Sequence, residues 1–374
     1  MSKDLHPITM PKWGLSMKEG SISKWNKSIG ENIKKGEMLL EIETEKVVNE
    51  MESPEDGTIL KFCANEGDTV PVGSLIALYG ENGTSEEIIN EFIEKFNSNF
   101  ESELSKELEE EEENNEKVKI GDLDINYIKN LNSKDKNILF IHGFGGDLNN
   151  WMFNQDDLSK EFNTYALDLP GHGLSSKTIK DASLSFLSEI IIKFCEENSL
   201  SDINLVGHSF GAGIAIKCAS ENNDFVKSLN LISPIGLGDE IDASYLDNFI
   251  ISDSRRDLKN ELEKLYFDPE IIKRDLVNEI LKFKRIDGVS ESLQLIKNEI
   301  INNEKQKINL RNEVDKLSIP TTIIWGKQDA IIPQSHTEKI NEKINIKIVD
   351  DCGHMAHTEH PNEVNAIIRN TISS

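Results

Sequence analysis

Two hydrophobic patterns divide the chain. Over residues 1–80, short stretches in which apolar and polar positions alternate recur between glycines, a pattern typical of half-buried β-strands. Beyond about residue 118, short continuous apolar runs alternate with longer segments of helical periodicity. The first pattern predicts a small all-β domain, and the second predicts an α/β domain built on a doubly wound parallel sheet.

The N-terminal segment contains an internal repeat with an offset of 37 residues. EGSISKWNKSIGENIKKGEMLLEIE aligns with DGTILKFCANEGDTVPVGSLIALYG, and glycines coincide in the two copies. Glycine is used where the backbone needs a positive φ or a close approach, so matched glycines indicate matched turns. We therefore expect a flattened β-barrel or sandwich with approximate two-fold symmetry. The matched positions are Gly20 with Gly57, Trp25 with Phe62, Gly30 with Gly67, and Gly36 with Gly73.

One lysine stands where the two halves of this repeat meet. LLEIETEKVVNEM, residues 39–51, is a predicted hairpin in which alternating glutamates precede Lys46 and apolar Val47 follows it. Lys46 is either a solvated surface charge or the attachment point of a prosthetic group. Its central position in a symmetric domain favours attachment.

The middle segment, residues 81–117, is predicted to be an acidic linker. It holds 3 lysines and 14 acidic residues, and its sequence EEEEENN should remain solvated and extended. Before that run, apolar residues recur at steps of three and four, which predicts an amphipathic helix. This helix packs on a neighbouring domain or docks a partner subunit. The apolar positions are Ile89, Phe92, Ile93, Phe96, Phe100, Leu104 and Leu108.

Residues 118–374 are predicted to form the α/β domain. Helices are expected over 183–198 and 211–221, between the strands. From about 235 to 312 strand patterns stop and charged amphipathic helices take over, which predicts a helical lid above the sheet. The strand-to-loop segments are 137–146, 163–173, 203–211, 228–234, 319–329 and 344–354.

The segment GHSFG, residues 207–211, has the G-x-S-x-G pattern of a nucleophile elbow. An apolar strand precedes it and a helical segment follows it, which is the context that this motif requires. A serine hydroxyl is a weak nucleophile and needs a base that is oriented by an acid. Ser209 is therefore the candidate nucleophile.

The candidate acid and base follow Ser209 in the chain. Asp329 comes just after one predicted strand, and His354 comes after the next. The order serine, acid, histidine is that of the α/β-hydrolase triad. Asp350 or Asp351 as the acid, and His357 as the base, are the alternatives.

Two backbone amides are the candidate donors to a developing oxyanion. One belongs to Phe210, the residue after the nucleophile, and the other to Phe144 in the glycine loop HGFGG. His142 and His172 lie in the loops HG and DLPGHG and are expected to shape them. His208 is expected to form a pocket wall or to steady the elbow.

Composition and charge narrow the possible functions. A net charge of −26 over 374 residues argues against nucleic acid binding, which needs a basic surface. The four cysteines lie far apart without metal-ligand spacing, so we expect reduced thiols and no metal. No apolar run of about 18 residues is present, and the N-terminus lacks a signal-peptide core. These features predict a cytoplasmic protein that does not interact with membranes.

Residues 5–80 resemble the lipoyl and biotinyl carrier domains. Biotinyl domains typically carry Met-Lys-Met at the modified lysine, whereas ETEKVV and MPKWGLSMKEG are similar to the lipoyl domains of oxo-acid and acetoin dehydrogenase complexes. The resemblance implies covalent lipoate on Lys46. Residues from about 120 to 374 resemble the α/β-hydrolases.

This combination of domains resembles the acyltransferase components of acetoin dehydrogenase complexes. The resemblance implies partner subunits of a thiamine-diphosphate-dependent acetoin dehydrogenase that load an acetyl group onto the arm at Lys46. Ser209 would accept the acetyl group and coenzyme A would receive it. Dihydrolipoamide dehydrogenase would reoxidise the arm, and a lipoate-attaching enzyme would install it. An oligomer is expected.

Other lipoyl acyltransferases use a His-x-x-x-Asp-Gly motif, which is absent here because Phe283 precedes Asp287-Gly288 at that spacing. Transfer therefore depends on the serine. Two further functions stay open: a thioesterase that releases the acyl group to water, and a non-catalytic carrier or scaffold. Basic lid residues contact coenzyme A phosphates or balance lid acids; they are Arg255, Arg256, Lys273, Arg274, Lys284 and Arg285.

Overall fold

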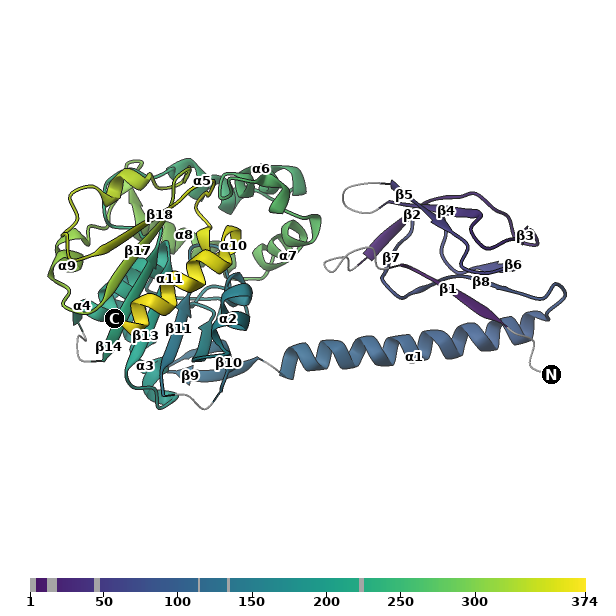
Figure 1. The fold of residues 1–374 in the computed structure, drawn as a ribbon, viewed down its shortest axis with the longest axis horizontal. Coiled ribbons are helices and arrows are strands. Elements are labelled where there is room, and N and C mark those ends of the chain that lie inside the picture. Colours follow the sequence, from purple (N-terminus) through teal and green to yellow (C-terminus); the bar gives the residue numbers. More distant parts are fainter. Residues whose placement is uncertain (1–4, 12–18, 44–47, 114, 133–134, 222–224) are drawn as a thin grey trace. The chain divides into compact units, whose positions relative to one another are not determined.

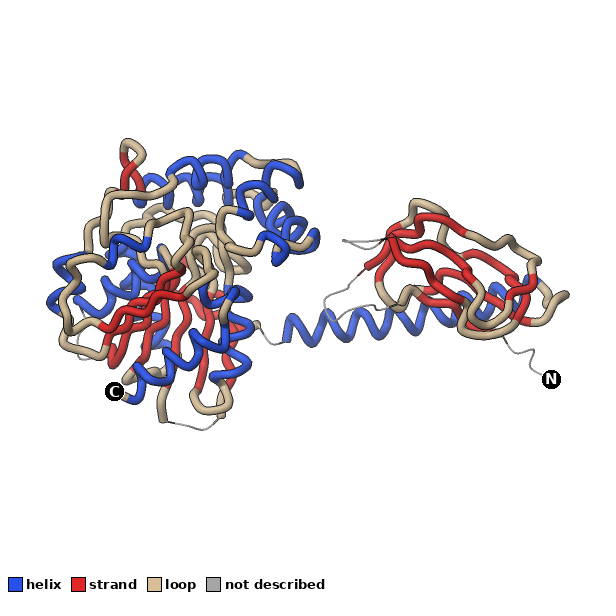
Figure 2. The backbone as a smooth tube through the Cα atoms, turned by 45° about the horizontal axis from the view of Figure 1, so that its top comes forward, coloured by secondary structure: helices blue, strands red, loops and turns tan. Residues whose placement is uncertain are grey.

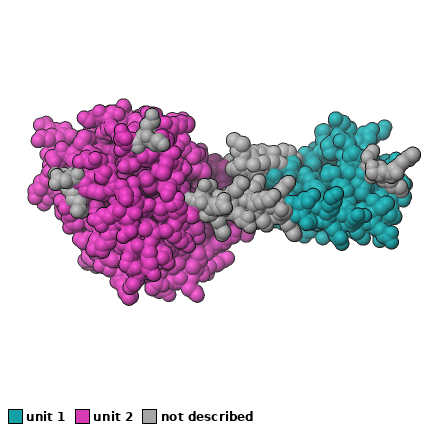
Figure 3. All heavy atoms as spheres, turned by 90° about the horizontal axis from the view of Figure 1, so that it is seen from below, with its two compact units in different colours: residues 1–113 teal, residues 114–374 magenta. Residues whose placement is uncertain are grey.

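The computed structural model describes residues 5–11, 19–43, 48–113, 115–132, 135–221 and 225–374. The chain forms two compact units, Met1–Glu113 and Asn114–Ser374, which are coloured separately in Figure 3. The first unit is built of strands and one long helix, whereas the second unit combines a large sheet with helices (Figures 1 and 2).

The first unit contains two four-stranded antiparallel sheets, which confirms the predicted β-sandwich. Ile8, Ile22, Ile42 and Ile59 belong to its buried core. One sheet has the order β1 (His6–Thr9), β8 (Leu75–Gly80), β6 (Gly57–Phe62), β3 (Asn32–Ile33). The other has the order β5 (Val48–Glu52), β4 (Met38–Glu43), β2 (Glu19–Trp25), β7 (Thr69–Pro71).

The two sheets repeat the same arrangement of strands. The offset of 37 residues converts β2 into β6, β3 into β7 and β4 into β8, and these pairs hold equivalent places in the two sheets. The matched Gly30 and Gly67 have φ values of 86° and 89°, which side chains disfavour. The matched Trp25 and Phe62 stack on each other with ring centroids 4.1 Å apart. The sequence repeat is thus a structural repeat.

The segment predicted as an acidic linker forms helix α1 (Glu86–Glu113), which belongs to the first unit. Its early residues pack on the sandwich: Ile89 is buried, and Lys61 Nζ donates to Asn90 Oδ1 at 2.8 Å. The expectation that the acidic run would be extended was wrong, since α1 continues to Glu113. Glutamate is a good helix former, so a helix that is already nucleated can propagate through such a run.

The second unit is built on an eight-stranded sheet with the order β18-β17-β14-β13-β11-β12-β10-β9. Neighbouring strands from β12 to β18 are parallel, as predicted. β9 (Glu116–Ile120) and β10 (Leu123–Asn130) form an antiparallel hairpin at one edge, which the sequence pattern had not indicated. The parallel strands are β11 (Asn137–Ile141), β12 (Asn163–Leu167), β13 (Ile203–His208), β14 (Val226–Ile232), β17 (Thr321–Gly326) and β18 (Asn345–Val349).

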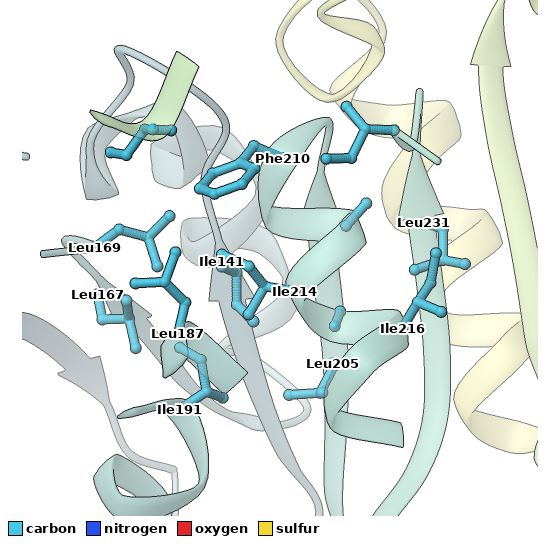
Figure 4. Packing of buried hydrophobic residues seen from close by; sticks show 14 of the residues in the cluster. Ile141, Leu167, Leu169, Leu187, Ile191, Leu205, Phe210, Ile214, Ile216 and Leu231 are labelled. Atoms are coloured by element: carbon cyan, nitrogen blue, oxygen red, sulfur yellow. The ribbon is translucent and has the colours of Figure 1, made fainter. Parts of the chain in front are cut away.

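Helices cover both faces of this sheet because alternate strand residues point to opposite faces. In β11, Leu139 and Ile141 join the core under α3 (Leu184–Glu197) and α4 (Phe210–Glu221), as Figure 4 shows for Ile141. Ile138 and Phe140 join the opposite core. That second core lies under η1 (Leu148–Trp151), α2 (Met152–Leu158), α10 (Ala356–Glu359) and α11 (Pro361–Ser373).

A helical lid follows β14, as predicted. It is interrupted by η2 (Pro269–Ile271) and by a hairpin of β15 (Ile301–Asn302) and β16 (Lys305–Gln306). After the lid come α9 (Arg311–Lys316) and η3 (Gln334–Thr337). No helix in the described part of the chain is both long and apolar enough to cross a membrane. The main lid helices are α5 (Ala243–Ile251), α6 (Arg255–Glu263), α7 (Arg274–Lys284) and α8 (Val289–Ile300).

Candidate active site

Ser209 lies in the sharp turn between β13 and α4, as the motif predicts. Its φ is 52°, a left-handed conformation that is uncommon for residues other than glycine and that marks backbone strain. The Ser209 amide donates to the Ile232 carbonyl at 2.9 Å, and its carbonyl accepts from the Ile235 amide at 3.3 Å. These bonds hold the strained turn in place.

Both glycines of the motif are required by their surroundings. A Cβ atom at Gly207 would lie 2.6 Å from the Ala212 Cα, and one at Gly211 would lie 2.3 Å from the Ile141 carbonyl oxygen. Backbone atoms cannot yield to such contacts, so the elbow tolerates no side chain at either position.

Asp329 and His354 form a buried pair. His354 Nδ1 lies 2.7 Å from Asp329 Oδ2, and the two side chains are 3% and 0% exposed. Asp329 Oδ2 also accepts from Trp325 Nε1 at 3.0 Å, while Oδ1 accepts from the amides of Ile331 and Ile332, both at 2.9 Å. Four donors therefore fix the position of this carboxylate. It holds His354 with Nδ1 as the donor and leaves Nε2 free to act as a base.

The alternative acids and base make other contacts. Asp350 is exposed and pairs with Lys327 Nζ at 2.5 Å. Asp351 is also exposed, and its carbonyl accepts from His360 Nε2 at 2.9 Å. His357 is fully buried, and neither ring nitrogen has a hydrogen-bond partner among the described residues. The geometry therefore favours Asp329 and His354 over these alternatives.

The glycine loop lies beside the elbow. A Cβ at Gly143 would lie 3.2 Å from Ser209 Cβ, which places the loop against the candidate nucleophile. Within the described residues, no hydrogen bond from the amides of Phe144 and Phe210 is found, so both remain able to donate to an oxyanion. His172 Nε2 accepts from the Gly145 amide at 3.1 Å and fixes this loop.

His142 joins the glycine loop to the loop after β12. Its Nε2 accepts from the Leu169 amide at 2.9 Å, and its Nδ1 donates to the Gly143 carbonyl at 2.7 Å. Burial lowers the pKa of His142 and lowers that of His172 well below the usual range, so both rings stay neutral. These contacts agree with the loop-shaping role that was expected of both residues.

His208 connects the elbow to the loop that carries His354. Its Nε2 donates to the His354 carbonyl at 3.0 Å, and the two rings lie 4.7 Å apart. Burial lowers the pKa of His208 well below its usual range, so the ring is neutral. The sequence placed His208 beside the nucleophile, but only the fold shows that it bonds to the segment bearing the candidate base.

We expect His208→Phe to lower kcat of the reaction at Ser209 by about tenfold or more. The variant loses the buried hydrogen bond to the His354 carbonyl, which costs about 1–3 kcal/mol and leaves the candidate base less well positioned. His208→Gln is the matched control, since its amide can still donate to the His354 carbonyl. Steady-state kinetics over a range of pH separate the two variants. Equal losses in both variants would contradict the positioning role.

A cavity opens above Ser209 and His354. The empty space inside it, including the open mouth, is about 690 Å³. The glycine loop and the elbow form the part of the cavity wall next to the sheet, and apolar side chains of the lid form the opposite wall. Sequence periodicity predicted the lid but not which of its residues face the site. The lid residues along the cavity are Ile241, Tyr245, Leu246, Phe249, Leu262, Leu265, Tyr266, Leu276, Ile280 and Ile300.

Lys46, the candidate attachment site, lies outside the described residues. The strands on either side of it, β4 and β5, are described and pair with each other up to Glu43 and Val48. No group of three or more side chains suited to hold a metal ion occurs in the described ranges.

Comparisons with known proteins agree with this architecture. The profile of the family described as "alpha/beta hydrolase fold" matches residues 136–361, and that of the family described as "Biotin-requiring enzyme" matches residues 6–78. Among solved structures, a meta-cleavage product hydrolase from Pseudomonas fluorescens has a similar fold. The aligned region covers 69% of this chain and 97% of the hydrolase chain. Its TM-score is 0.62 at 19% identity, which shows a shared fold.

Two relatives match nearly the whole chain. Both are the dihydrolipoyllysine-residue acetyltransferase component of an acetoin-cleaving system. The protein from Cupriavidus necator is 33% identical over 369 residues, covering 99% of this chain and 98% of its own length. The protein from Pseudomonas putida is 34% identical over 361 residues, covering 96% of each. The chain therefore belongs to the family of dihydrolipoyllysine-residue acetyltransferase components of acetoin-cleaving systems.

Proposed function

We propose that this chain transfers an acetyl group from a lipoyl group on Lys46 to coenzyme A, with Ser209 as nucleophile, His354 as base and Asp329 as its orienting acid. The end-to-end similarity to acetyltransferase components supports the reaction. One observation supports the mechanism above all others. Ser209, at a strained φ of 52°, shares a cavity with His354, which is bonded to buried Asp329.

Lys46 suits a covalent lipoyl group. β4 and β5 pair up to Glu43 and Val48, and Lys46 lies between these two strands in the sequence. When attached, the lipoyl group supplies a thiol that carries the acetyl group as a thioester. Residues 1–80 would thus serve as the carrier domain and residues 118–374 as the catalytic domain.

The first half-reaction moves the acetyl group to the serine. Ser209 Oγ attacks the thioester carbonyl while His354 Nε2 takes the hydroxyl proton. The amides of Phe144 and Phe210 stabilise the oxyanion. His354 then gives the proton to the departing sulfur, which leaves as a thiol, and an acetyl ester remains on Ser209 Oγ.

The second half-reaction regenerates the serine. The thiol of coenzyme A attacks the acetyl ester while His354 takes the thiol proton and returns it to Ser209 Oγ. The net change moves one acetyl group between two thiols. The end-to-end similarity to acetyltransferase components supports this outcome over hydrolysis.

As a component of a multi-protein system, the chain works with other subunits. We propose that a thiamine-diphosphate-dependent acetoin dehydrogenase supplies the acetyl group and that dihydrolipoamide dehydrogenase reoxidises the arm. A lipoate-attaching enzyme would modify Lys46. Attachment of donor and catalyst to one chain makes the transfer intramolecular, which raises the effective concentration of the acetyl group.

Labelled acetyl groups test this function. The lipoylated protein is charged with labelled acetyl, coenzyme A is added, and products are separated by chromatography. We expect the label in acetyl-CoA for the wild type and no transfer for Ser209→Ala. Label released only as acetate would identify a thioesterase, and transfer by Ser209→Ala at the wild-type rate would exclude the serine mechanism. Mass spectrometry of residues 36–61 checks the adduct on Lys46.

A further inference from the structure

The arginines of this chain are concentrated in the lid. Only six of its 41 basic residues are arginines, and four of these lie between positions 255 and 285. Arg255 and Arg256 begin α6, Arg274 begins α7, and Arg285 follows the end of α7. All four are exposed. Most basic residues of this chain are lysines, and four of the six arginines lie on one part of the surface, in the lid.

Lid lysines balance lid acids, but these arginines do not. In the described part of the chain, none of the four arginines forms an ion pair or a side-chain hydrogen bond, whereas six lid lysines form ion pairs. The lysine pairs are Lys259 with Glu263, Lys264 with Asp242 and Glu261, Lys282 with Glu279, Lys297 with Asp247, Lys305 with Asp239, and Lys307 with Glu299.

Three of the arginines come from segments that meet in space. Lys284 Nζ, at the end of α7, donates to the carbonyl of Ser252, which lies just before α6. This contact brings the end of α7, with Arg285, to the start of α6, with Arg255 and Arg256. Arg274 lies at the opposite end of α7, about 15 Å away at 1.5 Å per residue. We call Arg255, Arg256 and Arg285 the lid arginine cluster.

Helix stability does not explain Arg255 and Arg256. Positive charge in the first turn of a helix opposes the helix dipole and is unfavourable. The acids close by in sequence are Asp253, Asp257 and Asp287, and Asp257 accepts a hydrogen bond from Ser254 Oγ at 2.7 Å. None of these acids forms an ion pair with the cluster.

Lys284, the residue before Arg285, contacts a residue of the cavity wall. Lys284 Nζ lies 5.3 Å from the ring centroid of Phe249. Phe249 lines the cavity, and its ring lies 5.6 Å from the ring of Phe144 in the glycine loop. Lys284, which immediately precedes Arg285, is therefore separated from the cavity by a single side chain.

We propose that the lid arginine cluster binds the phosphate groups of coenzyme A while its thiol enters the cavity toward Ser209. This assignment rests on the proposed function. Guanidinium groups bind phosphate oxygens through paired hydrogen bonds, which lysine cannot reproduce. An acceptor that carries several phosphates on one end and a thiol on the other requires a basic surface near, but outside, an apolar cavity.

A series of acceptors tests this site in the full-length protein. Free S-acetyl-dihydrolipoamide is the donor, and coenzyme A, dephospho-coenzyme A and pantetheine are the acceptors. We expect Arg255→Gln/Arg256→Gln/Arg285→Gln to lower kcat/KM for coenzyme A by about thirtyfold. The value for pantetheine, which has no phosphate anchor to lose, should change by less than about twofold. Arg274→Gln is the matched control and should resemble the wild type with every acceptor.

Three outcomes would overturn the assignment. An unchanged kcat/KM for coenzyme A would show that the cluster binds nothing in this reaction. A parallel loss with pantetheine would indicate a distorted lid. The variant could instead lose activity only with the acetyl group carried on Lys46 and keep it with the free donor. This result would show that the cluster binds an acidic protein surface and not coenzyme A. Calorimetric titration of coenzyme A into Ser209→Ala, with and without the three substitutions, measures the site even if the serine mechanism fails.

Discussion

Replacement of Ser209 by alanine is expected to lower kcat for acetyl transfer by about six orders of magnitude, the loss seen when a serine nucleophile is removed from a triad. The reason is chemical, since alanine cannot form the acetyl ester through which both half-reactions pass. Rapid-mixing assays with S-acetyl-dihydrolipoamide and coenzyme A measure the rate. Ser209→Ala should still bind coenzyme A, which distinguishes loss of chemistry from loss of folding.

Asp329→Asn should reduce kcat by about four orders of magnitude, because an amide can donate to His354 and stabilise the wrong tautomer. The double variant Ser209→Ala/Asp329→Asn should be no slower than Ser209→Ala alone, since the residues act as a unit. Asp350→Asn is the matched control: this exposed carboxylate pairs with Lys327, and its loss should leave the rate within about twofold. A large loss in Asp350→Asn with an active Asp329→Asn would reverse the assignment of the acid.

Acidification should destabilise the second unit partly through His357. This ring packs against Trp151 with centroids 4.3 Å apart and the ring planes tilted by 31°, and burial lowers its pKa from 6.5 to about 3. Between these values the unfolded chain binds a proton that the folded chain does not, so stability is present above pH 6.5 and is lost as pH falls. The expected slope from this residue is about 1.4 kcal/mol per pH unit. Burial lowers the pKa of His142, His172 and His208 as well, with the same sign.

His357→Phe isolates this contribution. Phenylalanine keeps a ring against Trp151, and no hydrogen bond is lost because neither nitrogen of His357 has a partner in the described residues. Urea unfolding followed by circular dichroism at several pH values gives the free energy of unfolding. Between pH 6 and 4 the slope of the variant should be smaller by about 1.4 kcal/mol per pH unit. Identical slopes in the variant and the wild type would show that His357 is not buried in its neutral form.

The parts of this protein that follow from short stretches of chain could be predicted from the sequence. The offset of 37 residues predicted two copies of one strand pattern because each copy carries its own turns, as the φ values of Gly30 and Gly67 show. GHSFG predicted a strand, a turn and a helix because its glycines leave room that no other residue could, with backbone atoms within 3 Å of both positions.

The choice among distant residues was less predictable. Asp329, Asp350 and Asp351 all follow predicted strands, and sequence order alone could not exclude the last two. Asp329 is distinguished by four donors that lie close only after β17 and its loop have folded. The acidic run of α1 was misjudged for a related reason: charge repulsion favours an extended chain, but an apolar helix face upstream allows the helix to continue.

By itself, the sequence determined the two fold classes, the position of Lys46 in the repeat, and Ser209 as the candidate nucleophile, because each depends on residues that are close in the chain. Only the tertiary structure decided that His354 pairs with Asp329, that His208 bonds to the segment of His354, and that Lys284 at the end of α7 contacts Phe249 of the cavity wall. Such contacts join residues far apart in the chain. Their energies depend on burial and on the alignment of donors and acceptors, which exist only once the sheet and the lid have packed together.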